Sequence, residues 1–392
     1  MISLLLAIIY LAFISLGLPD CLLGAAWPLM HQEMGIPISY AGVLSMLIAC
    51  GTVTSSLLSA RLNSKLGTGL VTALSVTLTA LALLGFSQAT RFWMLCLLAI
   101  PYGLGAGSVD AALNNYVAQH YASRHMSWLH CMWGIGASIG PYIMGACLSA
   151  GKGWPAGYQS IGGLQILLSA ILLLSLPLWR KRQQTQAAAP VEYIPLQQVF
   201  SIPGAGACIL AFFCYCGAES TIFLWVSSYM VLHGQIPEDL AATYASLFFL
   251  GMTIGRALNG FLTIKWSDSV LIRLGSVIMF LGIGGLLLPF GQSITVISLF
   301  VLGLGCAPIY PCVIHSTPDV FGPEKSQALI GLQMAAAYLG ALLMPPVFGL
   351  VANHLTISLF PAFLFVMTAA MLCTYLCMLR SVKNRPEVRY ES

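Results

Sequence analysis

The chain has 392 residues, of which 58% are hydrophobic and only 7% are charged, with a formal net charge of +4. A soluble domain carries roughly 25% charged residues, so this composition excludes a water-soluble globular protein. Apolar segments recur along the chain at about the 20-residue length that a helix needs to cross a bilayer. They lack the polar–apolar alternation of a membrane β-barrel. We therefore predict an all-α integral membrane protein.

Twelve membrane-spanning helices are predicted from these segments. The first segment is longer than the apolar core of a signal peptide and has no basic residues before it, so we interpret it as a true span. The predicted ranges, in chain order, are 2–30, 38–62, 68–88, 92–120, 126–150, 160–179, 203–232, 240–263, 268–290, 294–316, 325–352 and 357–379.

A polar segment at 180–202 divides the chain near its midpoint. It begins with basic residues and contains proline, as linkers often do. We therefore expect an N-terminal six-helix bundle over 1–180, a linker over 181–202 and a C-terminal six-helix bundle over 203–392.

Lysine and arginine are distributed unevenly between the two sides of the predicted membrane. With the N-terminus inside, Arg91 and Lys152 face outward and Arg256 lies within the eighth span. The other thirteen are cytoplasmic: Arg61, Lys65, Arg124, Arg180, Lys181, Arg182, Lys265, Arg273, Lys325, Arg380, Lys383, Arg385 and Arg389. Because cytoplasmic loops are enriched in these residues, we expect both termini in the cytoplasm. The expected location is a plasma membrane, such as the bacterial inner membrane.

The two halves of the chain repeat one another. At an offset of 204, Tyr40, Ala41 and Gly51 match Tyr244, Ala245 and Gly255. At the same offset, Gly136, Pro141 and Gly145 match Gly340, Pro345 and Gly349. Residues 103–105 match 303–305 at an offset of 200. Parallel repeats of six spans are related by a pseudo-two-fold axis and enclose a substrate site between them, near the middle of the membrane.

This architecture resembles the major facilitator superfamily over almost the whole chain. The loop motif that this family carries after span two, of the type Gly-x-x-x-Asp-Arg-x-Gly-Arg, is reduced here to the sequence of residues 59–67. Its counterpart in the second half is hinted at by Gly255, Arg256 and residues 266–268. The architecture therefore supports the resemblance more strongly than the motif does.

Within that superfamily the chain is similar to the fucose–galactose–glucose proton symporters. The matching features are Asp20 in span one, Asp110 followed by two alanines and Asn114 in span four, and aromatic and polar residues before Gly134 in span five. The resemblance implies that Asp20 and Asp110 serve proton coupling and sugar recognition. The span-four acid is typically Glu in that group, and Trp133 stands where the group has a polar sugar contact, so the resemblance does not identify the sugar.

Four titratable residues in the spans are candidates for proton coupling: Asp20, Asp110, Glu219 and His130. Charged residues in hydrocarbon are costly, so they face other helices or a watery cavity. Glu219 occupies roughly the place of Asp20 in the repeat. His130 could titrate near neutral pH or hold Asp110 by a hydrogen bond. The alternative for each acid is a structural tie between helices.

A sugar needs polar groups for its hydroxyls and a flat apolar surface for its ring. The candidate substrate contacts are Asp20, Asp110, Asn114, Trp27, Trp133, Glu219, Tyr310, Gln333 and Tyr338. Tryptophan is also common as core packing, so the aromatic candidates have a structural alternative. We interpret Arg256 as an inter-helix tie at the inner end of span eight.

These features favour a secondary transporter that moves a small neutral polar solute, above all a sugar, with protons. We expect no lysine or arginine in the central part of the spans to bind an anionic substrate. The alternatives are a proton-antiporting drug or cation exporter of the same fold and, third, a non-transporting membrane sensor. The sequence contains no nucleotide-binding GxxxxGK[ST] run, no clustered metal ligands and no catalytic constellation. We therefore expect a monomer in the lipid bilayer that is not an enzyme, with no cofactor and no nucleic-acid partner.

Overall fold

The computed structural model of the protein describes residues 4–121, 123–180, 202–288 and 291–383. Every regular element in these ranges is a helix. Twelve helical segments are long and apolar enough to span a membrane, which confirms the predicted all-α fold of twelve spans. The predicted linker, 181–202, lies outside the described residues except for Ile202.

The helices fall into two successive sets, one in each half of the chain. The first set comprises α1 (Leu4–Asp20), α2 (Leu22–Glu33), α3 (Tyr40–Leu66), α4 (Thr68–Phe86), α5 (Phe92–His120), α6 (Ser123–Ser149), α7 (Gly153–Leu174) and α8 (Leu176–Arg180). The second comprises α10 (Ala205–Leu232), α11 (Glu238–Leu262), α12 (Asp268–Leu286), α13 (Gln292–Cys306), α14 (Ile309–Phe321), α15 (Pro323–His354), the 3-10 turn η1 (Ile357–Leu359) and α16 (Phe360–Lys383).

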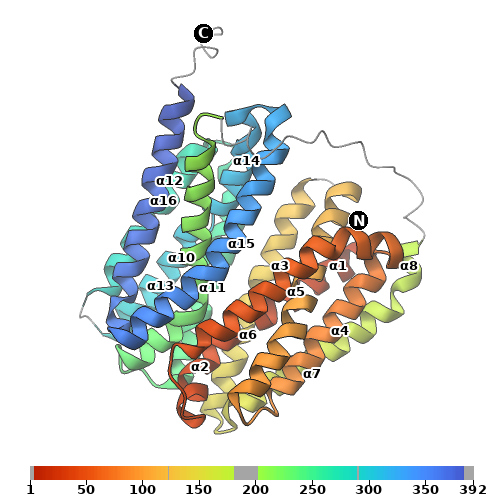
Figure 1. Ribbon diagram of the computed structural model, residues 1–392, viewed down its shortest axis with the longest axis vertical. Coiled ribbons are helices and arrows are strands. Elements are labelled where there is room, and N and C mark those ends of the chain that lie inside the picture. Colours follow the sequence, from red (N-terminus) through yellow and green to blue (C-terminus); the bar gives the residue numbers. More distant parts are fainter. Residues whose placement is uncertain (1–3, 122, 181–201, 289–290, 384–392) are drawn as a thin grey trace.

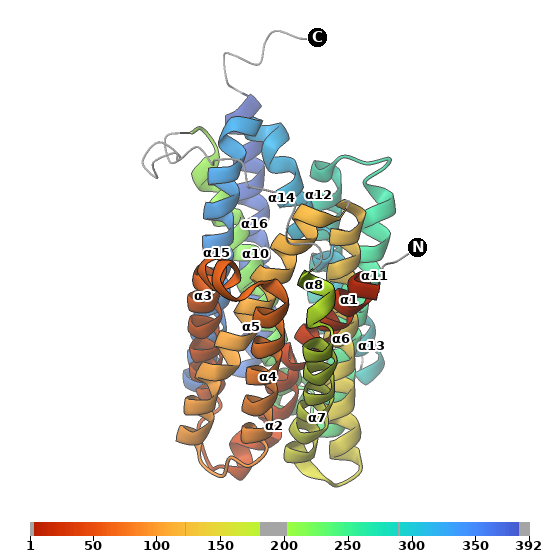
Figure 2. The ribbon, with the colours of Figure 1, turned by 90° about the vertical axis from the view of Figure 1, so that its right-hand side faces the viewer.

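The two sets have the same internal packing, as a pseudo-two-fold relation requires. In the first half α1 packs on α6, α3 on α5 and α4 on α7. In the second half the equivalent pairs are α10 with α15, α11 with α13 and α12 with α16. The two bundles stand side by side, and Figure 2 views them from the side of α4 and α7.

The repeated glycines occupy equivalent close contacts in the two bundles. Gly136 of α6 packs against the carbonyl of Ile14, and Gly340 of α15 packs against the carbonyl of Phe213. A side chain at either position would overlap that backbone, so only glycine allows this approach. The carbonyl partners are 199 residues apart, and the same offset relates Asp20 to Glu219. The predicted equivalence of these two acids therefore agrees with the packing.

Besides the short interruption at Ser175 near the end of the sixth span, two of the predicted spans are broken well inside their length. The first is divided between Asp20 and Leu22, and the tenth between Cys306 and Ile309. Each break leaves carbonyl groups without a partner in their own helix, and a tyrosine from another helix donates to one of them. Tyr102 of α5 donates to the carbonyl of Pro19 at 2.8 Å, and Tyr215 of α10 donates to the carbonyl of Cys306 at 2.9 Å.

The sixth span begins at Gly153, seven residues before the predicted start at 160. The preceding turn contains Gly151 and Gly153 with φ of +68° and +72°. These left-handed conformations suit glycine, and they let the chain turn tightly enough for α7 to begin at once. The predicted boundary at 160 is therefore too late.

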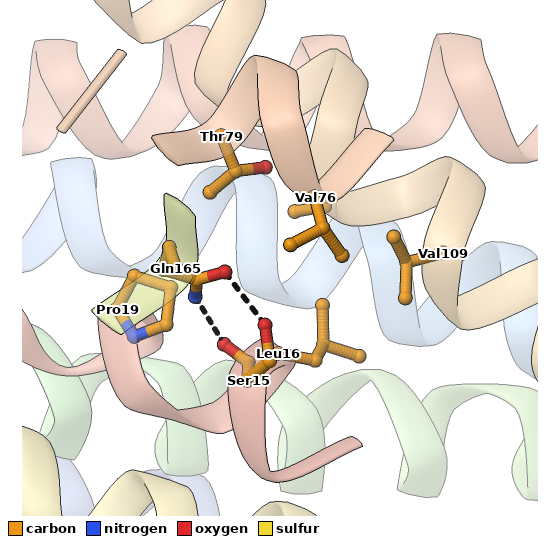
Figure 3. A pocket seen from close by; sticks show the side chains of 8 residues that line it. Ser15, Leu16, Pro19, Val76, Thr79, Val109 and Gln165 are labelled. Carbon is orange, nitrogen blue, oxygen red and sulfur yellow. Dashed lines mark hydrogen bonds between the residues drawn. The ribbon is translucent and has the colours of Figure 1, made fainter. Parts of the chain in front are cut away.

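Gln165 of α7 replaces a backbone hydrogen bond that Pro19 removes from α1. Pro19 has no N–H, so the carbonyl of Ser15, four residues earlier, loses its helical partner. The side-chain nitrogen of Gln165 donates to that carbonyl at 2.5 Å, and the hydroxyl of Ser15 donates to the amide oxygen of Gln165 at 2.6 Å. Figure 3 shows this pair of bonds beside Pro19, at a small pocket inside the first bundle.

We expect Gln165→Leu to destabilise the first bundle. The substitution leaves the buried carbonyl of Ser15 without a donor, and such a loss costs about 1–3 kcal/mol. The measurement is the midpoint of thermal denaturation of the purified protein in detergent. Leu167→Ala, at an exposed position of the same helix, is the control and should leave the midpoint unchanged. An equal midpoint for Gln165→Leu and the natural protein would contradict this role.

The halves meet chiefly along three pairs of helices, α6 with α11, α3 with α15 and α2 with α10. We call the end of the molecule that contains α2 the α2 end, and the opposite end, where α16 finishes, the termini end (Figure 1). At the α2 end the hydroxyl of Ser149, the last residue of α6, donates to Asp239 in the first turn of α11 at 2.7 Å. There too, Gly24 of α2 packs directly on the backbone of Phe223 and Leu224. The halves are therefore tied together at the α2 end.

Candidate functional site

Asp20 lies at the break between α1 and α2, with its carboxylate directed across to α6. The indole N–H of Trp133 donates to Asp20 Oδ2 at 2.6 Å. This short bond to a carboxylate sets the plane of the indole ring. Both residues are half-buried, so the pair stands at the edge of the first bundle rather than inside its core.

Arg256 of α11 reaches the same place from the second half. Its guanidinium carbon lies 5.0 Å from the centroid of the Trp133 ring, within the range of a cation–π contact. Its Nη2 lies 3.6 Å from Oε1 of Glu219, and the two side chains are 14% and 12% exposed. The prediction that the central spans hold no cation is therefore wrong, because the arginine side chain reaches from near the C-terminal end of α11 to Glu219 in the middle of α10.

Asp20, Trp133, Arg256 and Glu219 thus form one continuous set of contacts, which we call the interface chain. Asp20 and Trp133 belong to the first half, and Arg256 and Glu219 to the second. The interface chain extends further to Tyr215, whose hydroxyl lies 2.8 Å from Glu219 Oε1. Polar and charged groups of both halves therefore meet at one place between the bundles.

Asp110 and Asn114 form a second polar pair beside the interface chain. The amide nitrogen of Asn114 lies 2.8 Å from Asp110 Oδ1 and 3.0 Å from the carbonyl of Asp110. Asp110 lies close enough to Asp20 for their charges to interact. Its charge also acts across the interface on the hydroxyls of Tyr310 and Tyr338. The structure thus places these four candidates from the two halves near one another.

His130 lies beside this group but is not bonded to Asp110. Its ring packs edge-on against Phe13, with centroids 5.9 Å apart and an interplanar angle of 89°. The charge of Arg256 also acts on it. Within the described residues the side chain that holds Asp110 is Asn114, so the suggested bond from His130 is not present.

The comparison with protein families agrees with this architecture. The family model described as Major Facilitator Superfamily matches residues 4–288 and, in a second match, residues 235–391. The chain belongs to this superfamily. It is therefore a multi-pass membrane transporter that binds a small-molecule substrate, and it is not an enzyme.

The names of individual relatives of this transporter indicate different solutes. It is 22% identical to the glucose/mannose transporter GlcP of Bacillus subtilis, over 89% of this chain and 88% of that one. It is 23% identical to the quinolone resistance protein NorA of Staphylococcus aureus, over 61% of this chain and 62% of that one. In fold it is similar to the nucleoside transporter NupG, with a TM-score of 0.74, 16% identity and coverage of 98% and 100% of the two chains.

Two predicted substrate contacts of the transporter lie in tightly packed interiors instead. Trp27 is fully buried and donates its indole N–H to the carbonyl of Ile38 at 2.8 Å. Gln333 is also fully buried and donates to Thr317 Oγ1 at 3.0 Å and to the sulfur of Cys208 at 2.9 Å. The structure does not bring either side chain to the interface chain. Their hydrogen-bonding groups already have protein partners, as core residues require.

Three residues of the site were absent from the predicted set. Arg256 was predicted as an inter-helix tie and not as a site residue, and its contact with Glu219 does join α11 to α10. An ionisable residue within a span also indicates a functional position. Tyr215 and Phe223 lie one turn before and one turn after Glu219, so they share its helix face. The Phe223 ring lies 6.0 Å from the ring of Trp133 and 4.9 Å from that of Phe249. An aromatic layer therefore borders the interface chain.

Proposed function

We propose that this transporter moves a small neutral polar solute, and specifically a sugar, in symport with protons by alternating access. The observation that supports this most directly is the interface chain, in which acids on opposite halves meet around one oriented tryptophan. A sugar presents hydroxyl groups at its edges and an apolar face. Asp20, Asp110 and Asn114 can exchange hydrogen bonds with the hydroxyls, while Trp133 can cover the face.

The charge of the site argues against an anionic substrate. Among the described residues the site contains three carboxylates, those of Asp20, Asp110 and Glu219, but one guanidinium, that of Arg256, which lies beside Glu219. If all of them are ionised, the site carries an excess negative charge in a low-dielectric setting, where such an excess is costly. Taking up protons together with a neutral solute removes that excess. Similarity to a glucose/mannose transporter points the same way.

The same acidic excess supports a second candidate, an antiporter that exports lipophilic cations. A cation could replace the protons as the neutralising charge, and similarity to NorA, a quinolone resistance protein, agrees with such a role. The two candidates differ in the solute that they bind and in the direction of proton movement relative to it.

We further propose the arrangement of the protein in the membrane. The distribution of lysine and arginine supports a termini end in the cytoplasm of a plasma membrane, such as a bacterial inner membrane. The bundles then correspond to residues 1–180 and 203–392, joined by a cytoplasmic linker over 181–202, and the carrier acts as a monomer. Because the halves are tied together at the α2 end, this structure corresponds to a state closed toward the outside.

Uptake into proteoliposomes tests the function. Purified protein would be reconstituted with an inward proton gradient and offered radiolabelled glucose, mannose, fucose, galactose, sorbitol and uridine, and separately tetraphenylphosphonium. We expect concentrative uptake of one or more sugars that collapses with a protonophore. Asp110→Asn should abolish accumulation while sparing exchange down a gradient. Movement of the phosphonium cation against the proton gradient, with no sugar uptake, would contradict the sugar symporter and support the exporter.

We expect Asp20→Ala and Trp133→Ala each to weaken binding of the identified sugar at least tenfold. The first removes a hydrogen-bond acceptor that is ionisable, and losing a bond to a charged group costs about 1.5–3 kcal/mol, roughly ten- to a hundredfold in affinity. The second removes the ring that covers the sugar face. Isothermal titration calorimetry with the sugar that is taken up provides the measurement.

Trp93→Ala is the matched control for the tryptophan variant. Trp93 is 58% exposed in the first turn of α5, so its replacement should leave affinity unchanged. If both site variants bind the sugar as tightly as the natural protein, the substrate does not contact Asp20 or Trp133.

A further inference from the structure

The hydroxyl of Tyr215 has one proton and two acceptors. It lies 2.8 Å from Oε1 of Glu219 and 2.9 Å from the carbonyl of Cys306. Tyr215 is 1% exposed, so water does not readily supply a further donor. A phenol has a single O–H to donate. It can therefore serve one of these two acceptors at a time, and the other has no hydrogen bond from Tyr215 unless Glu219 is protonated and donates to the phenol oxygen.

The distance from Arg256 to Glu219 agrees with a protonated carboxyl group. Charge-assisted bonds between guanidinium and carboxylate are about 2.7–2.9 Å long, whereas Nη2 of Arg256 lies 3.6 Å from Oε1 of Glu219. The guanidinium rests instead on the ring of Trp133. A protonated Glu219 can donate its carboxyl O–H to the phenol oxygen across this 2.8 Å contact, and the phenol O–H can then donate to the carbonyl of Cys306. Both acceptors are then satisfied.

The carbonyl of Cys306 belongs to the break in the tenth span. Cys306 is the last residue of α13, and α14 begins at Ile309 after Ala307 and Pro308. Carbonyls at a helix end need a partner from outside the helix. Tyr215 supplies that partner from α10, so its hydroxyl helps to hold the angle between α13 and α14.

We propose that Tyr215 is a positioning residue that transmits the protonation state of Glu219 to the break between α13 and α14. When Glu219 releases its proton to water, the phenol O–H turns from the carbonyl of Cys306 to the new carboxylate, and Arg256 closes on the same carboxylate. The carbonyl loses its donor, and α14 becomes free to change its angle. This proposal rests on the proposed proton coupling and extends it by naming the element that moves.

Groups from several helices face Glu219 and belong to this switch. Arg256 of α11 is the cation, and Tyr310 of α14 and Cys306 at the end of α13 interact with the charge of Glu219. Cys21, at the break between α1 and α2, does so from the first half. Thiols and phenols are neutral near physiological pH, so Arg256 and Glu219 are the charged members of this group in the described part of the chain.

Amide hydrogen exchange of residues 309–314 tests the switch without any substrate. The protein would be measured in lipid nanodiscs at mildly acidic and mildly alkaline pH, with rates corrected for the intrinsic effect of pH. In the natural protein we expect these amides to exchange about five- to tenfold faster at alkaline pH, because the loss of one hydrogen bond is worth about that factor. Glu219→Gln should keep the slow rate at both pH values, and Tyr215→Phe should show the fast rate at both.

Tyr229→Phe is a closely matched control. Tyr229 is another buried tyrosine of α10, and its hydroxyl donates at 3.0 Å to the carbonyl of Leu286, the last residue of α12. Its replacement should speed exchange near the end of α12 and leave the pH response of residues 309–314 intact. A normal pH response in Tyr215→Phe or in Glu219→Gln would overturn the proposal. Absence of sugar uptake with an intact switch would overturn only the proposed substrate.

Discussion

Replacing Gly24 with leucine should abolish transport and hold the carrier open at the α2 end. Gly24 packs on α10 so closely that a Cβ atom would overlap the carbonyl of Phe223 and lie 2.9 Å from that of Leu224. Backbone atoms cannot move aside as a flexible side chain can. An overlap that costs about 1–3 kcal/mol shifts an equilibrium between two conformations by roughly five- to 150-fold.

Thiol labelling distinguishes this outcome from misfolding. Cys21 is 2% exposed next to the Asp20 break, and in a variant that keeps only this cysteine it should react with a membrane-impermeant maleimide once Gly24→Leu is present. Gly163→Leu is the control, because no atom of the described residues lies within 4 Å of a Cβ at Gly163. Normal uptake by Gly24→Leu would show that closure at the α2 end does not require this contact.

Arg256→Leu should be the most destabilising single change in the site. It leaves Glu219 buried between the halves without its cation, and breaking a buried pair from one side costs about 3–5 kcal/mol. It also removes the contact with the Trp133 ring, worth about 0.5–2 kcal/mol. Adding Glu219→Gln to Arg256→Leu removes the unpaired charge and should restore most of the lost stability.

The loss of thermal stability in Arg256→Leu should depend on pH in a definite direction. At acidic pH Glu219 can take up a proton and become neutral, so the loss of thermal stability should be small. It should grow as the pH rises and the carboxylate forms. Arg273→Leu, at an exposed position of α12, should show no such trend. A loss that is the same at every pH, or that the double variant does not recover, would mean that the ion pair does not stabilise the site.

Length and apolar character by themselves predicted the twelve spans, and matched residues at a constant offset predicted their repetition. Each span must satisfy its backbone hydrogen bonds internally and match the thickness of the bilayer, so it is a local property that can be recognised one segment at a time. The repeated glycines at 136 and 340 were visible for the same reason, because close helix contacts at equivalent places require the same small residue. Asp20, Asp110 and Glu219 stood out because a carboxylate within a span has few acceptable positions.

Only the tertiary structure decided which side chains meet. Trp27 and Trp133 are similar as sequence features, but one donates to a backbone carbonyl inside its bundle and the other to Asp20 at the interface. Arg256 lies toward the C-terminal end of α11, yet its long side chain reaches Glu219, which no helix periodicity can reveal. Contacts of this kind depend on the breaks in α1–α2 and α13–α14 and on how the two bundles are docked. The spans follow from local hydrophobicity, whereas the site follows from the packing of one half against the other.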